Sequence, residues 1–267
     1  MYGTILVPLD GSRFAEIALG PAAELAAAEG ATVTLVAVSD LDGTTAYLRE
    51  VAARLPVATA VLAVDDAETT PGSVIAGLAA DRPDALVCMA THGRTGVRRA
   101  VLGSVTETVL RSCEGPVLLT GPYVEADRPI VGGKLLVCLD GSDRAEAILP
   151  QATSWAKAFD MHVWLAAVVS HAPSVARRQV DFDVLESNYL ARLAHDLDRE
   201  LPSPVNWDTL HGTHPAVALA DVATRLPAAV IAVTTHGRTG LSRVALGSVA
   251  MELAHSSPCP VLVQRSV

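Results

Sequence analysis

The sequence predicts an α/β fold built from two tandem doubly wound domains, each a five-stranded parallel sheet with helices on both faces. Three observations carry this prediction. The chain repeats itself, short Val/Leu-rich runs alternate with helical stretches, and those runs lack the strict polar alternation of a half-exposed strand. With 267 residues, 50% of them hydrophobic, the chain is long and apolar enough to bury the cores of two domains.

The repeat extends along most of the chain. LVPLDGS at 6–12 returns as LVCLDGS at 136–142, an offset of 130 positions. MATHGRTGVRRAVLGSV at 89–105 returns as VTTHGRTGLSRVALGSV at 233–249, an offset of 144, so the second copy carries 14 extra residues. Self-similarity on this scale indicates two copies of one structural unit.

We therefore expect domains at 1–122 and 133–267, joined by a linker at 123–132 that contains Pro, Gly and charge. The extra residues fall in the second crossover of copy two. There a long helical pattern spans 177–201, where copy one has only about 44–55. This long helix is either an amphipathic cover over its own domain or a surface that binds an unknown protein partner.

The elements of copy one follow from its apolar pattern. Five runs predict strands at 4–9, 32–38, 59–64, 85–90 and 116–120. A helical stripe with i, i+4, i+7 spacing lies between the first two strands in each copy, at Ala18, Ala22, Leu25 and Ala26 and at Ile148, Ala152, Trp155 and Ala156. Strand, helix and strand in repetition imply right-handed crossovers and a parallel sheet, as in Rossmann-like and flavodoxin-like folds.

Composition and charge exclude several classes of protein. A net charge of -9 and a pI of about 5.3 leave no overall basic character for nucleic-acid binding. No apolar run approaches the roughly 20 residues of a membrane helix, and the N-terminus lacks a signal-peptide pattern, so we expect a cytoplasmic protein. The four cysteines form no CxxC pair and the histidines no metal-ligand spacing. We expect buried, reduced thiols and no structural metal.

The two most repeated loops predict a ligand site. In an open parallel sheet a ligand binds outside the carboxyl ends of the strands, where the strand order reverses. If strand four lies on the other side of strand one from strand two, the loops there are PLDGS and THGRTGVRRAVLGS. Their glycines allow a close backbone approach, and each Gly-Ser opens a helix whose N–H groups favour phosphate. These residues are Gly93, Gly96, Gly103 and Ser104 in copy one and Gly237, Gly240, Gly247 and Ser248 in copy two.

Structural roles for the same residues remain open. Ser104 with Glu107 has the pattern of a capping box, and Ser248 that of an ordinary N-cap. Asp10 and Asp140 begin DGS turns that an Asp can simply cap. His92 and His236 either hold loop backbone or contact a ligand. The sequence contains no P-loop, no GxGxxG after a first strand and no GxSxG elbow.

Taken together, VPLDGS and VCLDGS, THGRTG, LGSV and the closing PVLL and PVLV resemble the universal stress protein family in its tandem two-domain form. The resemblance covers essentially the whole chain. ATP-binding members carry G-2x-G-9x-G-[ST], and nine residues separate Gly93 from Gly103 and Gly237 from Gly247. The first Gly of that pattern is replaced by Ala90 in copy one and by Thr234 in copy two.

The resemblance implies an ATP site, with or without Mg²⁺, in each copy. Asp10 and Asp140 would contact adenine beside Val38 and Val168, and the glycine loops would wrap ribose and phosphates. It also implies pairing of the two domains through their fifth strands, an internal pseudo-dimer, and leaves open a homodimer of the whole chain. The nucleotide-binding candidates are completed by Pro8, Leu9, Arg94, Val105, Leu139, Arg238 and Val249.

Three functions follow. The first is a cytoplasmic stress-response regulator that binds adenine nucleotide, and the second is a nucleotide-free interaction scaffold of the same fold. The third is a slow ATPase; no catalytic residue is assigned, because no carboxylate pair is placed to hold Mg²⁺.

Overall fold

The structure, a computed structural model, describes residues 1–38, 43–65, 68–92, 102–125, 128–169, 179–236 and 247–265, and for 179–186 it describes the backbone alone. Copy one contains β1 (Thr4–Pro8), a 3-10 turn (Ala15–Ala18), α1 (Leu19–Glu29), β2 (Thr32–Val38), α2 (Thr44–Ala52), β3 (Thr59–Val64), α3 (Pro71–Ala80), β4 (Ala85–Ala90), α4 (Ser104–Ser112) and β5 (Val117–Thr120). Copy two contains β6 (Lys134–Leu139), α5 (Asp143–Glu146), α6 (Leu149–Ala158), β7 (His162–Val169), α7 (Gln179–Leu197), β8 (Asn206–His211), α8 (Pro215–Arg225), β9 (Ala228–Thr234), α9 (Ser248–Ser256) and β10 (Val261–Gln264).

Local chemistry explains several element boundaries. Helix α1 ends at Gly30, whose φ of 67° is a left-handed conformation that costs glycine little. Helix α3 begins after Thr70, whose side chain accepts a hydrogen bond from the Ser73 N–H, and Pro71 occupies the first helical position. Gly11 and Gly141 have φ of 84° and 77°, which allows the chain to turn sharply after β1 and β6.

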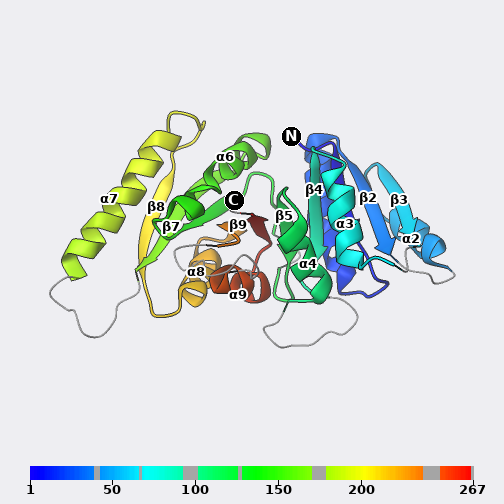
Figure 1. Cartoon of the computed structure of the whole chain (residues 1–267). Coiled ribbons are helices and arrows are strands. Elements are labelled where there is room, and N and C mark those ends of the chain that lie inside the picture. Colours follow the sequence, from blue (N-terminus) through cyan, green and yellow to red (C-terminus); the bar gives the residue numbers. More distant parts are fainter. Residues whose placement is uncertain are drawn as a thin grey trace.

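The strands form one ten-stranded sheet in the order β3-β2-β1-β4-β5-β10-β9-β6-β7-β8. Within each copy the neighbouring strands are parallel, and only the β5–β10 pair at the centre is antiparallel. Figure 1 shows the two copies side by side, with β5 and β10 between them. The predicted tandem doubly wound α/β fold is confirmed, and its strand order reverses between β1 and β4 and between β6 and β9.

The central strand pair has the symmetry of a two-fold interface. Leu118 lies opposite Leu262, its own counterpart at an offset of 144, and Val117 lies opposite Val263. Equivalent residues that face each other are what an isologous contact requires. The pairing covers an apolar strand edge in each copy, as the resemblance implied.

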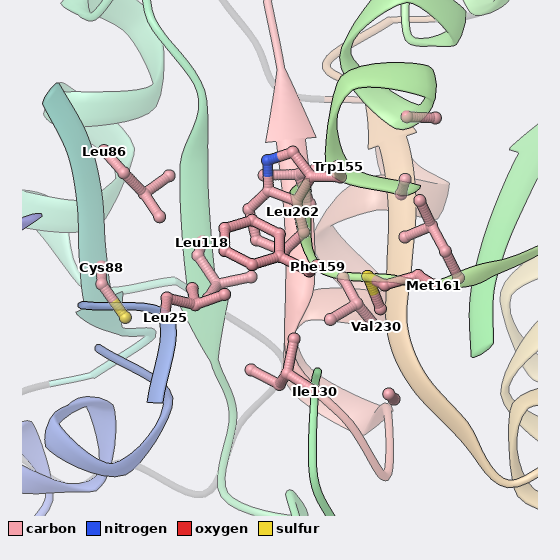
Figure 2. Packing of buried hydrophobic residues seen from close by; sticks show 14 of the residues in the cluster. Leu25, Leu86, Cys88, Leu118, Ile130, Trp155, Phe159, Met161, Val230 and Leu262 are labelled. Atoms are coloured by element: carbon pink, nitrogen blue, oxygen red, sulfur yellow. The ribbon is translucent and has the colours of Figure 1, made fainter. Parts of the chain in front are cut away.

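The sheet separates two hydrophobic layers, and each layer crosses both copies. Helices α1, α2, α6 and α7 pack on one face over residues that include Val7, Leu118 and Leu262. Helices α3, α4, α8 and α9 pack on the other face over Leu6, Leu119 and other alternate residues. Figure 2 shows Leu118 and Leu262 in the first layer, close to the aromatic rings of Trp155 and Phe159. Each core is therefore shared between the copies.

The segment that precedes the first strand of each copy forms hydrogen bonds with the other copy. The Tyr2 hydroxyl, before β1, accepts hydrogen bonds of 2.7 Å from Trp155 Nε1 and from Gln151 Nε2 of α6. In the mirrored arrangement Glu24 Oε1 of α1 accepts from the backbone N–H groups of Ile130 and Val131, before β6, at 2.7 and 2.9 Å. The segment between the copies is therefore docked on α1 along part of its length.

Element boundaries differ from the predictions at helix starts and ends. Ala18 closes a 3-10 turn and Ile148 is the N-cap of α6, so both stripes begin just before the α-helix proper, although every stripe residue is buried. Helix α7 ends at Leu197 instead of 201, and residues 177 and 178 of the predicted helix lie outside the described residues.

The four cysteines are buried and form no disulfide, as predicted. Burial raises the pKa of the Cys88 thiol to about 12 and that of Cys259 to about 11. The thiol form is therefore the stable one at neutral pH. In the part of the chain that the structure describes, no helix is both long enough and apolar enough to cross a membrane.

Candidate functional site

The residues that the structure describes directly after β1 and β4 meet at the carboxyl edge of the sheet. The two strands are parallel neighbours, with Thr4 opposite Ala85 and Leu6 opposite Val87. Beyond the strands, the Phe14 ring contacts the His92 ring edge-on, with 6.0 Å between ring centroids. The strand order therefore reverses where predicted, and the beginnings of the two segments that follow these strands are in contact there.

The aspartate after the first strand holds its own turn in each copy. Asp10 Oδ1 accepts hydrogen bonds from the Ser12 backbone N–H at 2.9 Å and the Ser12 hydroxyl at 2.6 Å. Asp140 Oδ1 accepts the same pair from Ser142, at 3.1 and 2.6 Å. The structural role left open for these carboxylates is thus present, and any ligand contact would be additional to it.

The helices that follow β4 and β9 both have glycine as their N-cap. Gly103 is the N-cap of α4 and Gly247 that of α9, and no described side chain caps either helix. The capping-box interpretation of Ser104 with Glu107 and the N-cap interpretation of Ser248 are therefore wrong, because both serines are the first helical residues. The first N–H groups of a helix have no partner within it, so these starts present donors to an anion.

Hydrogen bonds fix the start of α4 against the end of β4. The Gly103 N–H donates to the Thr91 carbonyl oxygen at 2.9 Å, and the Thr91 N–H donates to the Thr120 carbonyl oxygen of β5 at 3.1 Å. Glu107, the other half of the predicted capping box, instead pairs with Arg111 one turn later. Thr91 therefore connects the sheet to the start of α4. It is a positioning residue that the sequence pattern did not single out.

Copy two repeats this arrangement. The Thr235 N–H donates to the Gln264 carbonyl oxygen at 2.9 Å, and the Thr235 carbonyl oxygen accepts from the Gly247 N–H. The threonine hydroxyls contact the next histidine in both copies, at 3.0 Å from His92 Nδ1 and 3.1 Å from His236 Nδ1. The histidines are thus held by their own loops, and the structural alternative for them is present.

The two copies differ in the threonine hydrogen bonds at the ends of β4 and β9. In copy one the Thr106 hydroxyl of α4 lies 3.2 Å from the Ala90 carbonyl oxygen and 3.3 Å from that of Thr91. The counterpart of Thr106 is Ala250, which has no hydroxyl. There Thr234 donates its own hydroxyl to the His236 carbonyl oxygen at 2.8 Å.

A carbonyl oxygen lies close to the backbone at both helix-starting glycines, and closer at Gly247 than at Gly103. A Cβ atom on Gly247 would lie 2.8 Å from the Thr235 carbonyl oxygen, a distance that forces the backbone to move. A Cβ on Gly103 would lie 3.3 Å from the corresponding Thr91 oxygen, which is tight but closer to ordinary contact. The second copy is therefore the more closely packed at this point.

The remaining candidates divide into described and undescribed residues. Pro8, Leu9, Leu139, Val38 and Val168 lie at or next to the carboxyl ends of β1, β6, β2 and β7. Val105 and Val249 are the second residues of α4 and α9. Gly93, Arg94, Gly96, Gly237, Arg238 and Gly240 lie outside the described residues. Within the described ranges, no group of three or more His, Cys, Asp and Glu side chains could hold a metal ion.

Comparison with known proteins gives one consistent family. The chain is 31% identical over 137 residues to a universal stress protein of Methanocaldococcus jannaschii, a match that covers 49% of this chain and 80% of that protein. A universal stress protein of Mycobacterium tuberculosis is 27% identical over 209 residues, 74% of this chain. That match spans 64% of the length of the mycobacterial protein.

Solved structures share the fold along the whole chain. A functionally unknown protein from Pseudomonas aeruginosa matches with a TM-score of 0.72 and 20% identity, covering 99% of this chain and 93% of that one. A universal stress protein from Archaeoglobus fulgidus matches with a TM-score of 0.63 and 18% identity over 100% of both chains. The model of the universal stress protein family matches residues 1–121 and again residues 133–265. This chain belongs to the universal stress protein family, in a tandem form with two copies of the family domain.

Proposed function

We propose that the chain binds ATP in the crevice between β1 and β4 of copy one, and more weakly in the equivalent crevice of copy two. Nucleotide occupancy would make it a regulator in the stress response of the cytoplasm. Domain boundaries at 1–122 and 133–267 would then give each domain one nucleotide site.

One observation carries this proposal most directly. At the reversal of strand order, the start of α4 has a glycine N-cap and no side-chain cap from the residues that the structure describes, and the Gly103–Thr91 hydrogen bond holds it beside the end of β4. Such a helix start favours a phosphate through its N–H groups and its dipole. Asp10, on the neighbouring strand end, supplies an acceptor suited to the amino group of an adenine.

A nucleotide-free scaffold is the alternative, favoured by the residues at the first glycine position. Thr234 is only 8% exposed, and its hydroxyl already donates within the chain. Its branched side chain would crowd a ribose at this place. Ala90 adds one methyl group in copy one. Nucleotide analysis of the purified and then denatured protein separates the two functions, because a scaffold would release none.

The Asp10 carboxylate is expected to contribute to ATP binding beyond its turn. Asp10→Asn keeps an Oδ1 acceptor for Ser12 but replaces the second oxygen with an N–H donor, which repels the adenine amino group. Loss of a hydrogen bond to a charged group costs about 1.5–3 kcal/mol, so we expect about 10- to 100-fold weaker binding by calorimetry. Ser12→Ala is the control, because it removes the hydroxyl hydrogen bond of the turn and leaves both the Ser12 backbone N–H bond and the Asp10 carboxylate. Unchanged affinity in Asp10→Asn would restrict Asp10 to its turn.

The two copies are expected to bind ATP unequally, with the tight site in copy one. The double variant Thr234→Ala with Ala250→Thr gives copy two the pattern of copy one, in which the helix threonine holds the strand end. We expect this variant to strengthen the weaker phase of an ATP titration, because it removes the branched side chain while supplying a replacement hydroxyl. Thr234→Ala alone separates the two effects. Two equal sites in the unmodified protein, or a second site weakened by the double variant, would show that Thr234 helps binding.

A further inference from the structure

A contact between two histidines crosses the boundary between the copies. His92 follows β4 of copy one, and His255 lies in the last turn of α9 in copy two; their ring centroids are 5.4 Å apart at an interplanar angle of 69°. The rings of Phe14 and Tyr123 extend the contact at either end, each with 6.0 Å between centroids. A chain of four rings thus connects the loop after β1 to the end of α9.

His92 is joined to the residue that positions the copy-one helix start. It is only 9% exposed, and its Nδ1 lies 3.0 Å from the Thr91 hydroxyl. The Thr91 carbonyl oxygen accepts the Gly103 N–H, so the His92 ring packs directly beside the strand end that holds the N-cap of α4. A change in the packing of His92 therefore moves Thr91, and with it the N-cap of α4 at the candidate phosphate site.

The second copy cannot make the reciprocal contact. The counterpart of His255 is Arg111, and the counterpart of Phe14 is Arg144. Arg111 pairs with Glu107, and its side chain is 46% exposed. An arginine keeps its charge at every physiological pH. Proton sensitivity of this kind can therefore act on copy one alone.

The surroundings of His255 disfavour its charged form. Its pKa is lowered, first by burial and then by His92. Its Nδ1 is buried and has no hydrogen-bond partner among the described residues. The end of a helix and the Tyr123 ring both favour a cation, but the direction of the shift means that burial outweighs them.

Two carboxylates lie on the chain segments around His255 that the structure describes. Glu252 lies on its own helix, and Glu125 belongs to the segment between β5 and β6. The Glu125 N–H donates to the Pro258 carbonyl oxygen at 3.0 Å, while its carboxylate pairs with Arg128 at 2.7 Å. That carboxylate is therefore already neutralised by an arginine.

We propose that His255 of copy two is a proton-sensitive positioning residue for the nucleotide site of copy one. While the His255 imidazole is neutral, its ring packs against His92 and keeps His92 against Thr91 beside Gly103. Protonation of His255 loosens this packing and weakens nucleotide binding in copy one. This inference rests on the proposed function and names a regulation of the same site.

The sign of the pH dependence follows from the direction of the shift. A histidine whose pKa is lower in the folded state takes up its proton more readily when the contact is open. The contribution of the His92–His255 contact to binding is therefore complete above about pH 6.5, the pKa of a histidine in the unfolded chain. This contribution is lost as the pH falls from there through the lowered pKa of His255 in the folded protein. Affinity in copy one should therefore decrease as the pH falls below about 6.5.

ATP titrations at pH 8.0 and pH 5.5 test the proposal with His255→Phe as the matched variant. Phenylalanine keeps a ring but carries no proton, and His255→Gln repeats the comparison without a ring. ATP takes up a proton of its own near pH ~6, which affects every variant alike. At pH 8.0 we expect the unmodified protein and His255→Phe to bind ATP with equal affinity in the tight phase. At pH 5.5 we expect the unmodified protein to lose about tenfold more affinity in this phase than His255→Phe does.

A nucleotide-free measurement keeps the two proposals separable. The imidazole NMR signal of His255 should titrate below the ordinary pKa of a histidine, because burial and then the neighbouring His92 lower the pKa of His255. A His255 titration at the ordinary histidine pKa, or equal losses of ATP affinity in both proteins, overturns the role of His255 alone. No ATP binding in either protein at pH 8.0 overturns the proposed function, and the regulation with it.

Discussion

Trp155→Ala is expected to lower the free energy of unfolding of the whole chain by about 3–5 kcal/mol, the range for large aromatic deletions in a core. Trp155 is fully buried and packs edge-on against Phe159, with 5.1 Å between ring centroids, and against Tyr2 at 6.3 Å. Tyr2 belongs to the first copy and Trp155 to the second. The substitution therefore leaves a cavity in a core that both copies share.

The measurement is denaturant unfolding followed by both fluorescence and circular dichroism. Because the hydrophobic layers cross both copies, we expect one cooperative transition before and after the substitution. Tyr2→Phe is the companion variant. It leaves Trp155 Nε1 and Gln151 Nε2 without their shared acceptor and should cost about 1–3 kcal/mol. A transition that separates into two steps in the unmodified protein would contradict a shared core.

Gly247→Ala is expected to destabilise the protein by about 1–3 kcal/mol, the cost of overpacking, whereas Gly103→Ala should cost less than about 1 kcal/mol. The two glycines are counterparts, and both are N-caps with extended backbone angles that alanine can adopt. The expected stability difference comes from the nearest carbonyl oxygen. A Cβ on Gly247 would lie 2.8 Å from the Thr235 oxygen, and a Cβ on Gly103 would lie 3.3 Å from the Thr91 oxygen. Any cost of alanine as an N-cap is common to both variants and cancels in the comparison.

Thermal unfolding of the two variants gives the stability difference, and ATP titration gives its consequence at each site. Gly103→Val enlarges the test at the copy-one site, because a branched side chain would obstruct the path of a phosphate to the α4 N–H groups. We expect this variant to lose the tight phase of binding. Normal ATP binding by Gly103→Val would show that the start of α4 is not the phosphate site.

The repeat and the apolar runs were enough to predict the fold. Each of the five strands predicted in copy one agrees with the observed strand to within one residue at either end, because buried parallel strands are continuous apolar segments. The helix starts were less predictable. Ser104 and Glu107 have the spacing of a capping box, but the Gly103–Thr91 hydrogen bond to the end of β4 places the N-cap one residue earlier. A tertiary contact here overrides a local pattern.

Sequence alone determined the alternation of strands and helices and the glycine and aspartate candidates after the strands, because periodicity and turn chemistry are local properties. Only the tertiary structure decided the strand order, with its reversal between β1 and β4, and the residues through which the copies meet. The pairing of Leu118 with Leu262, the docking of Tyr2 on α6 and the ring contact of His92 with His255 each join residues more than a hundred positions apart. No local pattern encodes such contacts; they follow from covering two exposed strand edges with each other, which brings together side chains of the two copies.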